Sequence, residues 1–310
     1  MSVDDAPSPA SGDERRMQRL RAAAVDARGR ADATFRRIEA MRPENRLVDA
    51  LFGTFERESG AGGALFAGAI AFRFFMLLIP YVFVIVFGFG LGANASGTDP
   101  HELARSAGIT GLAARAVLAG AGASPSVRWI GFLLALYGLF SGARNLLKAL
   151  RIVHSIMWDV PLVRLKNSTR ATFGLLGVVV IGSVMVEVVH RLKSISFGFW
   201  LLSMVAVSAI PAGIWLACSL TVFPRITAAT WRDLLPGSVV FGLGVQGLHY
   251  VTVVYVAGSI ASKSETYGAI GAALTILLWA YMLGRLVTGC VALNATLWEI
   301  DHRPAAEVSS

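Results

Sequence analysis

The sequence predicts an all-α protein, a polytopic bundle of about six transmembrane helices preceded by a cytoplasmic amphipathic helix. Composition is the first indication, because 55% of the residues are hydrophobic, only 15% are charged, and the mean hydropathy is +0.61. A soluble domain is typically about a quarter charged. The second indication is residues 267–299, where Arg285 is the only charge before Glu299. Roughly 20 apolar residues in a helix cross the hydrocarbon core of a bilayer. Similar apolar runs occur earlier in the chain, which is the third indication.

The N-terminal part of the chain has a different composition. Residues 1–60 hold eleven of the 28 Lys and Arg residues and eleven of the 20 Asp and Glu residues. Residues 1–12 are rich in Pro, Ser and Asp and do not form the apolar run of a cleavable signal peptide. We therefore expect residues 1–42 to form a charged, partly disordered cytoplasmic arm.

Residues 43–60 predict an amphipathic helix. Leu47, Leu51 and Phe55 follow one another at i, i+4 and i+8, which places them in one apolar stripe among charged residues. Pro43 suits the first turn of such a helix. A helix of this type lies in the membrane interface, and we expect it to lead into the first span.

Residues 61–299 are predicted to form the six-helix transmembrane domain, and residues 300–310 a short cytoplasmic tail. Each span is a long apolar run bounded by charged, small or polar residues. The spans are predicted at residues 62–92, 128–150, 171–189, 197–223, 231–260 and 267–299.

Smaller features are expected within and between these spans. Pro80 and Pro211 fall inside the first and fourth spans, where proline favours a kink. Residues 101–121 are expected to form a short helix. Asp233 is expected to cap the fifth span, with Pro236 in its first turn.

The distribution of basic residues predicts the orientation. With a cytoplasmic N-terminus, twenty Lys and Arg residues lie inside and six outside, while Arg73 and Arg285 are embedded. Cytoplasmic loops of membrane proteins retain such an excess. We therefore expect a multi-pass protein of the cell membrane with both termini in the cytoplasm. The same bias accounts for the net charge of +8 without a nucleic-acid partner.

The embedded charges are the strongest candidates for function. A charge near mid-membrane costs at least about 2.5–3.5 kcal/mol and usually faces the bundle interior or water. One interpretation is a polar pathway that attracts an anionic amphiphile; the other is that these residues bond to neighbouring helices and hold the bundle together. The candidate residues are Arg73, Arg285, Gln246, His249, Glu187 and Asn294.

Enzymatic chemistry is not indicated. The five histidines are scattered with no ligand spacing, and Cys218 and Cys290 are isolated in apolar runs. The GLGVQG sequence beginning at Gly242 lies inside a predicted span rather than between a strand and a helix, so we interpret it as close helix packing. We expect no metal, no cofactor and no catalytic residue.

Four segments together resemble the YihY/BrkB family of bacterial inner-membrane proteins, whose actinobacterial members often carry the YhjD label. They are GALFAGAIAFRFFMLLIPYVFVIVFGFG from Gly63, SGARNLLKALRIVHSIMWDV from Ser141, FPRITAATWRDLLPGSVVFG from Phe223 and YGAIGAALTILLWAYMLGRLVTGCVALNA from Tyr267. The residues that carry the pattern are Pro80, Arg144, Trp231, Arg232, Pro236, Gly237, Tyr267, Gly268, Gly271 and Trp279. Arg73 departs from it, since an uncharged residue is expected there.

The resemblance implies a six-helix membrane domain without a cofactor and an association with envelope integrity. Members have been labelled ribonuclease BN, which the scattered histidines do not support. The first hypothesis is a transporter or lipid-handling protein of the bacterial cytoplasmic membrane, with an anionic amphiphile as cargo and the lipid bilayer as partner. The alternative is a non-transporting scaffold for envelope proteins, and a homo-oligomer stays open.

Overall fold

The computed structural model describes the chain from residue 36 onward, with gaps, and isolated residues before it. The described residues are 20–21, 26, 28–30, 33–34, 36–97, 99, 118, 120, 122, 124–165, 167–192, 197–251 and 257–303. In 95–96, 182–192, 197–204, 206–207, 257–269 and 272 the description covers the backbone alone. Most of the arm expected in residues 1–42 and most of the short helix expected in 101–121 fall outside the described residues.

The described residues confirm an all-helical protein with an N-terminal helix before the apolar ones. The helices are α2 (Arg46–Gly60), α3 (Gly63–Ser96), α6 (Pro125–Met157), α7 (Ser168–Leu192), α8 (Phe197–Thr221), α9 (Trp231–Val251) and α10 (Ala257–Asp301). By length and composition, α3, α6, α9 and the part of α10 from Ala273 are able to cross a membrane. In α7 and α8, the stretches Ser168–Ile181 and Ser208–Thr221 are shorter apolar helices.

The boundary between the fifth and sixth predicted spans differs from the structure. Residues 257–260, which the prediction assigned to the fifth span, belong to α10, and this helix includes ten residues before the predicted start at Tyr267. The first turns of α10 contain Lys263 and Glu265. Hydropathy locates the part of a helix that suits the bilayer, and it gives no signal for a polar extension of the same helix.

The start of α9 also differs from the expectation for Asp233. The helix begins at Trp231, and the Thr230 N–H and Oγ1 both donate to Asp233 Oδ2, at 2.7 and 2.8 Å. Asp233 is therefore the third helical residue and reaches back to Thr230, as in a capping box. Pro236 consequently lies in the second turn, where its missing N–H interrupts the helical hydrogen bonds.

The chain divides into two units, residues 1–53 and residues 54–310. In the first unit, Asn45 Oδ1 accepts a hydrogen bond from the Leu47 N–H at 3.0 Å, so Asn45 rather than Pro43 begins α2. Arg42 forms an ion pair with Asp49 at 2.6 Å. The apolar stripe predicted for α2 is exposed to solvent, at 73% for Leu47, 67% for Leu51 and 66% for Phe55.

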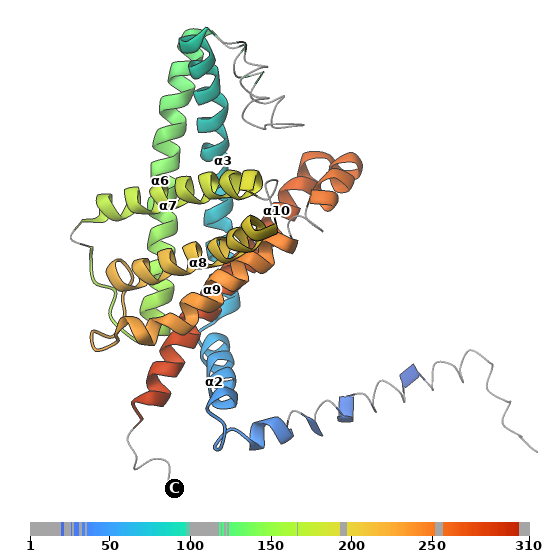
Figure 1. Cartoon of the computed structure of the whole chain (residues 1–310), viewed down its shortest axis with the longest axis vertical. Helices are drawn as coiled ribbons and strands as arrows, with labels where there is room; N and C mark the ends of the chain where they lie inside the picture. Colours follow the sequence, from blue (N-terminus) through green and yellow to red (C-terminus); the bar gives the residue numbers. More distant parts are fainter. Residues whose placement is uncertain are drawn as a thin grey trace, which may run out of the picture. The chain divides into compact units, whose positions relative to one another are not determined.

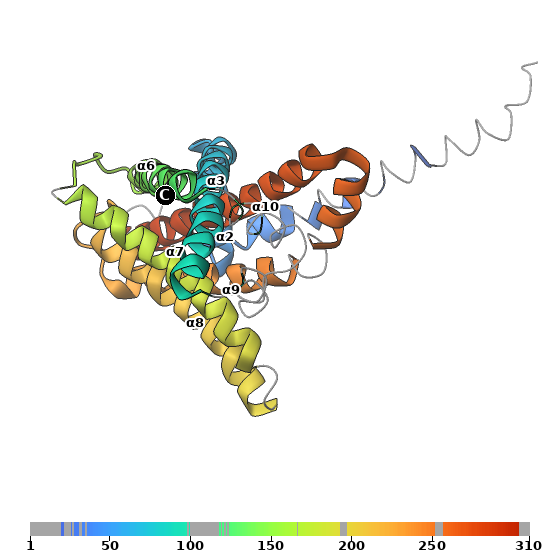
Figure 2. The ribbon, with the colours of Figure 1, turned by 90° about the horizontal axis from the view of Figure 1, so that it is seen from above.

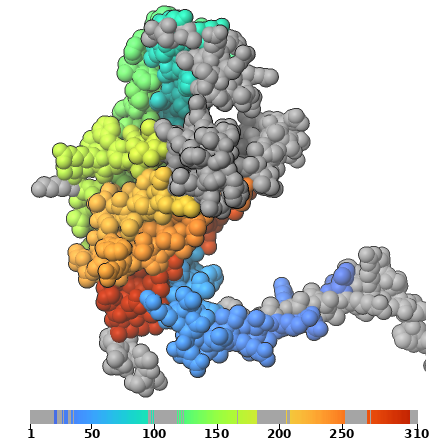
Figure 3. Space-filling model, viewed as in Figure 1, coloured from blue at the N-terminus to red at the C-terminus, as the bar shows by residue number. Residues whose placement is uncertain are grey.

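In the second unit the longest helices pack in pairs. Helices α3 and α6 lie side by side, α8 packs on α9, and α10 contacts both α3 and α9 (Figures 1 and 2). Small residues allow these contacts, since α6 Gly138 and Gly142 face α3 Pro80 and Leu77. The space-filling view shows the orange surface of α9 directly beside the red C-terminal half of α10 (Figure 3). The core includes Leu146, Val153, Met157, Leu234 and Val291.

Candidate functional site

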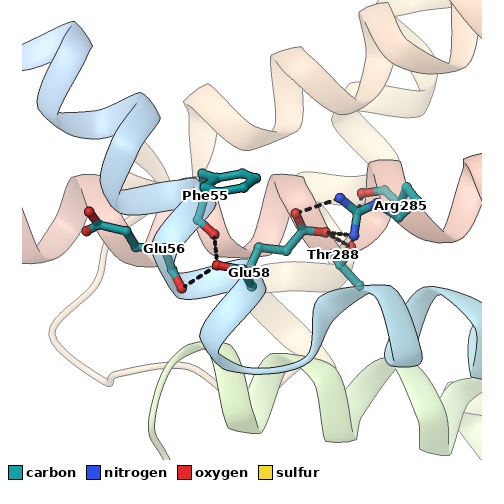
Figure 4. A network of polar contacts seen from close by, with 6 residues as sticks. Phe55, Glu56, Glu58, Arg285 and Thr288 are labelled. Carbon is teal, nitrogen blue, oxygen red and sulfur yellow. Dashed lines mark hydrogen bonds and ion pairs between the residues drawn. The ribbon is translucent and has the colours of Figure 1, made fainter. Parts of the chain in front are cut away.

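Arg285 of α10 is neutralised by a carboxylate that the sequence did not single out. Its Nη1 lies 2.9 Å from Glu58 Oε1, and its Nη2 lies 3.0 Å from Glu58 Oε2, which makes the pair bidentate. Thr288, one turn along α10, donates its hydroxyl to Glu58 Oε1 at 2.8 Å. Figure 4 shows Glu58 of α2 pointing between these two side chains. A bidentate guanidinium–carboxylate pair fixes geometry as well as charge.

The turn between α2 and α3 positions Glu58 for this contact. Gly62 has a φ of 75°, in the left-handed region that favours glycine. A Cβ on Gly63 would lie 2.8 Å from the Glu58 carbonyl oxygen, so the backbones approach closely there. Arg57 adds a second attachment, because its Nη1 donates to the Met157 carbonyl at 2.6 Å and its Nη2 pairs with Glu299.

Arg73 has a different partner from Arg285. Its Nη1 donates to the carbonyl of Asn145 in α6 at 2.8 Å. This bond spans from α3 to α6 and gives the guanidinium a backbone acceptor rather than a carboxylate. Arg285 therefore attaches α10 to α2, whereas Arg73 attaches α3 to α6. The polar pathway expected to contain both arginines stays a prediction.

Asn294 connects α10 to the interrupted turn of α9. Its Oδ1 accepts the Gly237 N–H at 2.7 Å, and its Nδ2 donates to the Leu234 carbonyl at 3.1 Å. Pro236 stands between these two positions and has no N–H of its own. Gly237 is also the point of closest approach, since a Cβ there would lie 2.5 Å from the Cys290 carbonyl oxygen. The side chain of Asn294 thus bonds to the backbone of α9 on both sides of Pro236.

The other candidates for the polar pathway lie apart from these contacts. Gln246 is buried, and within the described part of the chain its Oε1 has no hydrogen-bond donor. His249 is half-buried, with its ring 6.3 Å from that of Tyr250. Glu187 lies in α7, but its side chain is outside the described residues.

The residues that carry the family pattern are spread over several helices. Trp279 packs against Phe74 with ring centroids 5.8 Å apart, and the Arg232 guanidinium lies over the Trp231 ring at 5.4 Å. Gly271 is buried, while the side-chain positions of Tyr267 and Gly268 fall outside the described residues. These contacts are consistent with helix packing.

A cationic cavity lies at the C-terminal half of α6. It is open to the surface, has a volume of about 750 Å³, and is lined by Arg144, Lys148 and Arg151 of α6 and by Arg164 of the following segment. The three α6 residues stand at i, i+4 and i+7 and so share one helix face. None of the described residues that line the cavity is an Asp or Glu. Among the described residues, Arg144, Lys148 and Arg164 have no carboxylate partner.

Arg151 shapes this cationic cavity. Its Nη2 donates to the Val163 carbonyl at 2.6 Å, and its Nε donates to the Val222 carbonyl at 3.2 Å. The first bond fixes the segment that carries Arg164, and the second attaches the residue following α8. Because carbonyl groups carry no net charge, Arg151 still contributes a positive charge to the wall.

A second hollow adjoins the cationic cavity. It has a volume of about 530 Å³ and lies between α6, α7 and the end of α8, where Gly174, Leu175 and Ala217 line it. Its wall is mostly apolar, with Arg170 as its charged member. The two hollows share Leu147 and Leu165 as wall residues. We refer to this second hollow as the apolar cleft.

From the sequence, the basic residues of this region indicated only the membrane orientation. Arg144 was a candidate solely because it belongs to the family pattern. The signal for a site was the i, i+4, i+7 spacing of Arg144, Lys148 and Arg151, followed by Arg164 after the Pro161 break. Glu58 carried no comparable signal, because its partner is 227 residues away. No group of three His, Cys, Asp or Glu residues that could hold a metal occurs in the part of the chain that the structure describes.

Comparison with known proteins agrees with this architecture. Residues 54–309 match the family model described as Virulence factor BrkB. Neither the comparison with curated proteins nor that with solved structures finds a match.

Proposed function

Since the chain belongs to the BrkB family of proteins, we propose that this multi-pass membrane protein binds an anionic amphiphile and moves it between leaflets in support of envelope integrity. The family match and the apolar helices support the membrane setting. The cargo, its movement and the cytoplasmic position of both termini are part of the proposal.

The observation that carries this proposal is the cationic cavity beside the apolar cleft. An amphiphile has a charged head and an apolar tail, and the two hollows offer one surface for each, with shared wall residues between them. Basic pockets between transmembrane helices on the cytoplasmic side bind anionic head groups. The excess of basic residues at this end of α6 favours its cytoplasmic location.

The embedded arginines support a different role from the one that their sequence positions suggested. Arg285 is paired with Glu58, and Arg73 is bonded to the Asn145 carbonyl. These contacts favour holding the helices together, while Arg144, Lys148 and Arg164 are available to a ligand. The hydrogen bond of Arg73 lies beside the cationic cavity, because its acceptor residue, Asn145, is one of the residues that line the cavity.

Reconstitution into liposomes tests the proposal. Fluorescent analogues of phosphatidylglycerol, phosphatidic acid and phosphatidylcholine are followed between leaflets by quenching from outside. We expect wild-type protein to move the anionic analogues faster than protein-free liposomes and to leave phosphatidylcholine at the protein-free rate. The triple substitution Arg144→Gln, Lys148→Gln, Arg164→Gln is expected to abolish this movement.

The matched control is Arg232→Gln, which removes an exposed arginine at the start of α9 that lines neither hollow. This variant is expected to move the anionic lipid analogues between leaflets at the wild-type rate. Movement at the protein-free rate for wild type would overturn the transport proposal. Binding of anionic lipid without movement would favour the scaffold alternative.

A further inference from the structure

We propose that the ligand of this site is a lipid whose head group ends in a phosphate monoester or diphosphate, with the phosphate in the cationic cavity and one hydrocarbon chain in the apolar cleft. This inference rests on the proposed function and deepens it by naming the ligand class. Three properties of the site carry it, namely its charge, its continuity and its fixed wall.

The charge of the cavity exceeds what a phosphodiester neutralises. Among the described residues of its wall, four side chains are cationic and none carries a carboxylate. A phosphodiester such as phosphatidylglycerol carries one negative charge, whereas a phosphate monoester carries about −1.5 to −2 near pH 7 and presents three acceptor oxygens. Arginine binds such oxygens through paired N–H donors. The monoester therefore matches the cavity better.

The continuity of the two hollows favours a lipid over a soluble phosphate. Leu147 and Leu165 line both, so a molecule that occupies the cavity reaches the cleft directly past these side chains. The cleft lies between helices α6, α7 and α8, two of which contain the shorter apolar stretches. A hydrocarbon chain that leaves bulk water for this surface is stabilised by the apolar area that it buries.

The wall is fixed before a ligand binds. The Arg151 guanidinium bonds to the Val163 and Val222 carbonyls, so the segment with Arg164 is tied to α6. Lys and Arg residues on a mobile loop attract any anionic surface, but they do not discriminate between head groups of similar charge. Donors whose backbones are held on one helix face and one tied segment lose less freedom on binding, which favours discrimination between head groups.

Lipid binding to the full-length, detergent-purified protein tests the inference. Native mass spectrometry measures the binding of phosphatidic acid, phosphatidylglycerol and phosphatidylcholine with identical chains, with inorganic phosphate as competitor. We expect phosphatidic acid to bind about tenfold more tightly than phosphatidylglycerol, because it adds up to about one negative charge facing the same cations. Inorganic phosphate is expected to compete weakly, because it lacks the chain.

Two sets of variants separate the contributions of the head group and the chain. The substitutions Lys148→Gln and Arg164→Gln together are expected to abolish the preference for phosphatidic acid, Lys148→Arg to keep it, and Arg232→Gln to leave it unchanged. In the cleft, Gly174→Leu fills space, since nothing lies within 4 Å of a Cβ there. Gly177→Leu is its control, because Gly177 lies one turn on in α7, is equally uncrowded and does not line the cleft.

The outcomes divide as follows. A preference lost with Lys148 and Arg164, together with weaker lipid binding in Gly174→Leu alone, supports the inference. Equal binding of phosphatidic acid and phosphatidylglycerol, or a preference unchanged in the double variant, overturns it and indicates nonspecific anionic lipid. Displacement by inorganic phosphate at the concentration of the lipid indicates a free-phosphate site and also overturns it.

The two proposals fail differently. If the protein binds phosphatidic acid selectively but moves no lipid in liposomes, the proposed transport fails and the ligand class stands. If it moves both anionic lipids equally and binds them equally, the transport stands and the ligand class fails. Thermal unfolding of every variant shows whether a loss of binding reflects a loss of fold.

Discussion

At the scale of single residues, the embedded charges are explained by specific partners. Burial of an arginine in a low-dielectric region is tolerated when a carboxylate and further hydrogen bonds accompany it. Arg285 pairs with the Glu58 carboxylate, and the Thr288 hydroxyl donates a further hydrogen bond to that carboxylate. Arg73 instead uses a backbone carbonyl. The two arginines are therefore paired in different ways, with a carboxylate in one case and a backbone carbonyl in the other, according to which group the neighbouring helix places within reach.

The Glu58–Arg285 pair predicts a measurable coupling. Because the Glu58 side chain is 10% exposed and the Arg285 side chain 38%, the loss of one partner should cost about 1–3 kcal/mol, between exposed and fully buried pairs. Thermal unfolding in detergent of Glu58→Gln, Arg285→Gln and the double variant measures it. We expect the double variant to be no less stable than the worse single variant.

Glu44→Gln is the control for this cycle, since Glu44 is exposed and has no ion pair among the described residues. It should leave the unfolding temperature unchanged. Strictly additive effects of Glu58→Gln and Arg285→Gln would show that the two side chains are not coupled.

At the scale of elements, a side chain of α10 joins α9 at the proline inside that helix. Pro236 removes a backbone donor, Gly237 lets α10 approach, and Asn294 bonds to both sides of the proline. The three residues belong to two segments that the sequence places far apart, and each has a separate local reason to be unfavourable in a helix. Together they form a single joint.

Gly237→Ala is expected to disrupt this joint. The added Cβ would lie 2.5 Å from the Cys290 carbonyl oxygen and 2.6 Å from Asn294 Oδ1, so α10 must move away. Overpacking of this kind costs about 1–3 kcal/mol. Thermal unfolding should show a lower midpoint for Gly237→Ala than for Gly247→Ala, whose Cβ meets nothing within 4 Å on the same helix. Equal midpoints would contradict the close contact.

The exposed stripe of α2 belongs to the same scale. Leu47, Leu51 and Phe55 are all at least 66% exposed, and an apolar stripe on a charged helix suits the membrane interface. In a protein without its native cysteines, an environment-sensitive fluorophore at Leu51→Cys should report an apolar surrounding in liposomes. The same label at Glu56→Cys, on the polar side, should report water. Identical spectra at both positions would show that the stripe does not enter the interface.

At the scale of the whole molecule, the distribution of charge determines the expected orientation. Twenty basic residues are assigned to the cytoplasmic side and six to the outside, and this bias sets topology in membrane proteins. In the expected orientation the cationic cavity would face the cytoplasm, because it lies at the basic end of α6. The proposed ligand would then enter from the inner leaflet.

Reporter fusions test this orientation. Green fluorescent protein is fluorescent only inside, and alkaline phosphatase is active only outside the cytoplasmic membrane. We expect fluorescence and no phosphatase activity for fusions after residue 310 and for insertions between Phe223 and Thr230, the connection from α8 to α9. Phosphatase activity at either position would reverse the orientation of that part of the chain.

The helices were predictable from the sequence because their signals are local. Apolar runs located α3, α7 and α8 with described ends within four residues of the prediction. Helix α6 continues seven residues past its predicted end, and α10 includes ten residues before its predicted start, since a polar extension lacks a hydropathy signal. The stripe of α2 was also visible in the sequence. A composition poor in charge was sufficient to indicate the membrane.

What only the tertiary structure decided is which distant residues meet. Nothing local in the sequence joins Glu58 to Arg285 or Gly237 to Asn294, because these contacts depend on how the helices pack rather than on the propensity of any one of them. The basic residues Arg144, Lys148 and Arg164 likewise gave the sequence its charge bias, but their place in the wall of one cavity follows from the bonds of Arg151 to two other segments. The sequence by itself determined that this is a helical membrane protein, since hydrophobicity acts residue by residue. The ligand-binding surface that we propose required the fold, since charge complementarity depends on distance in space.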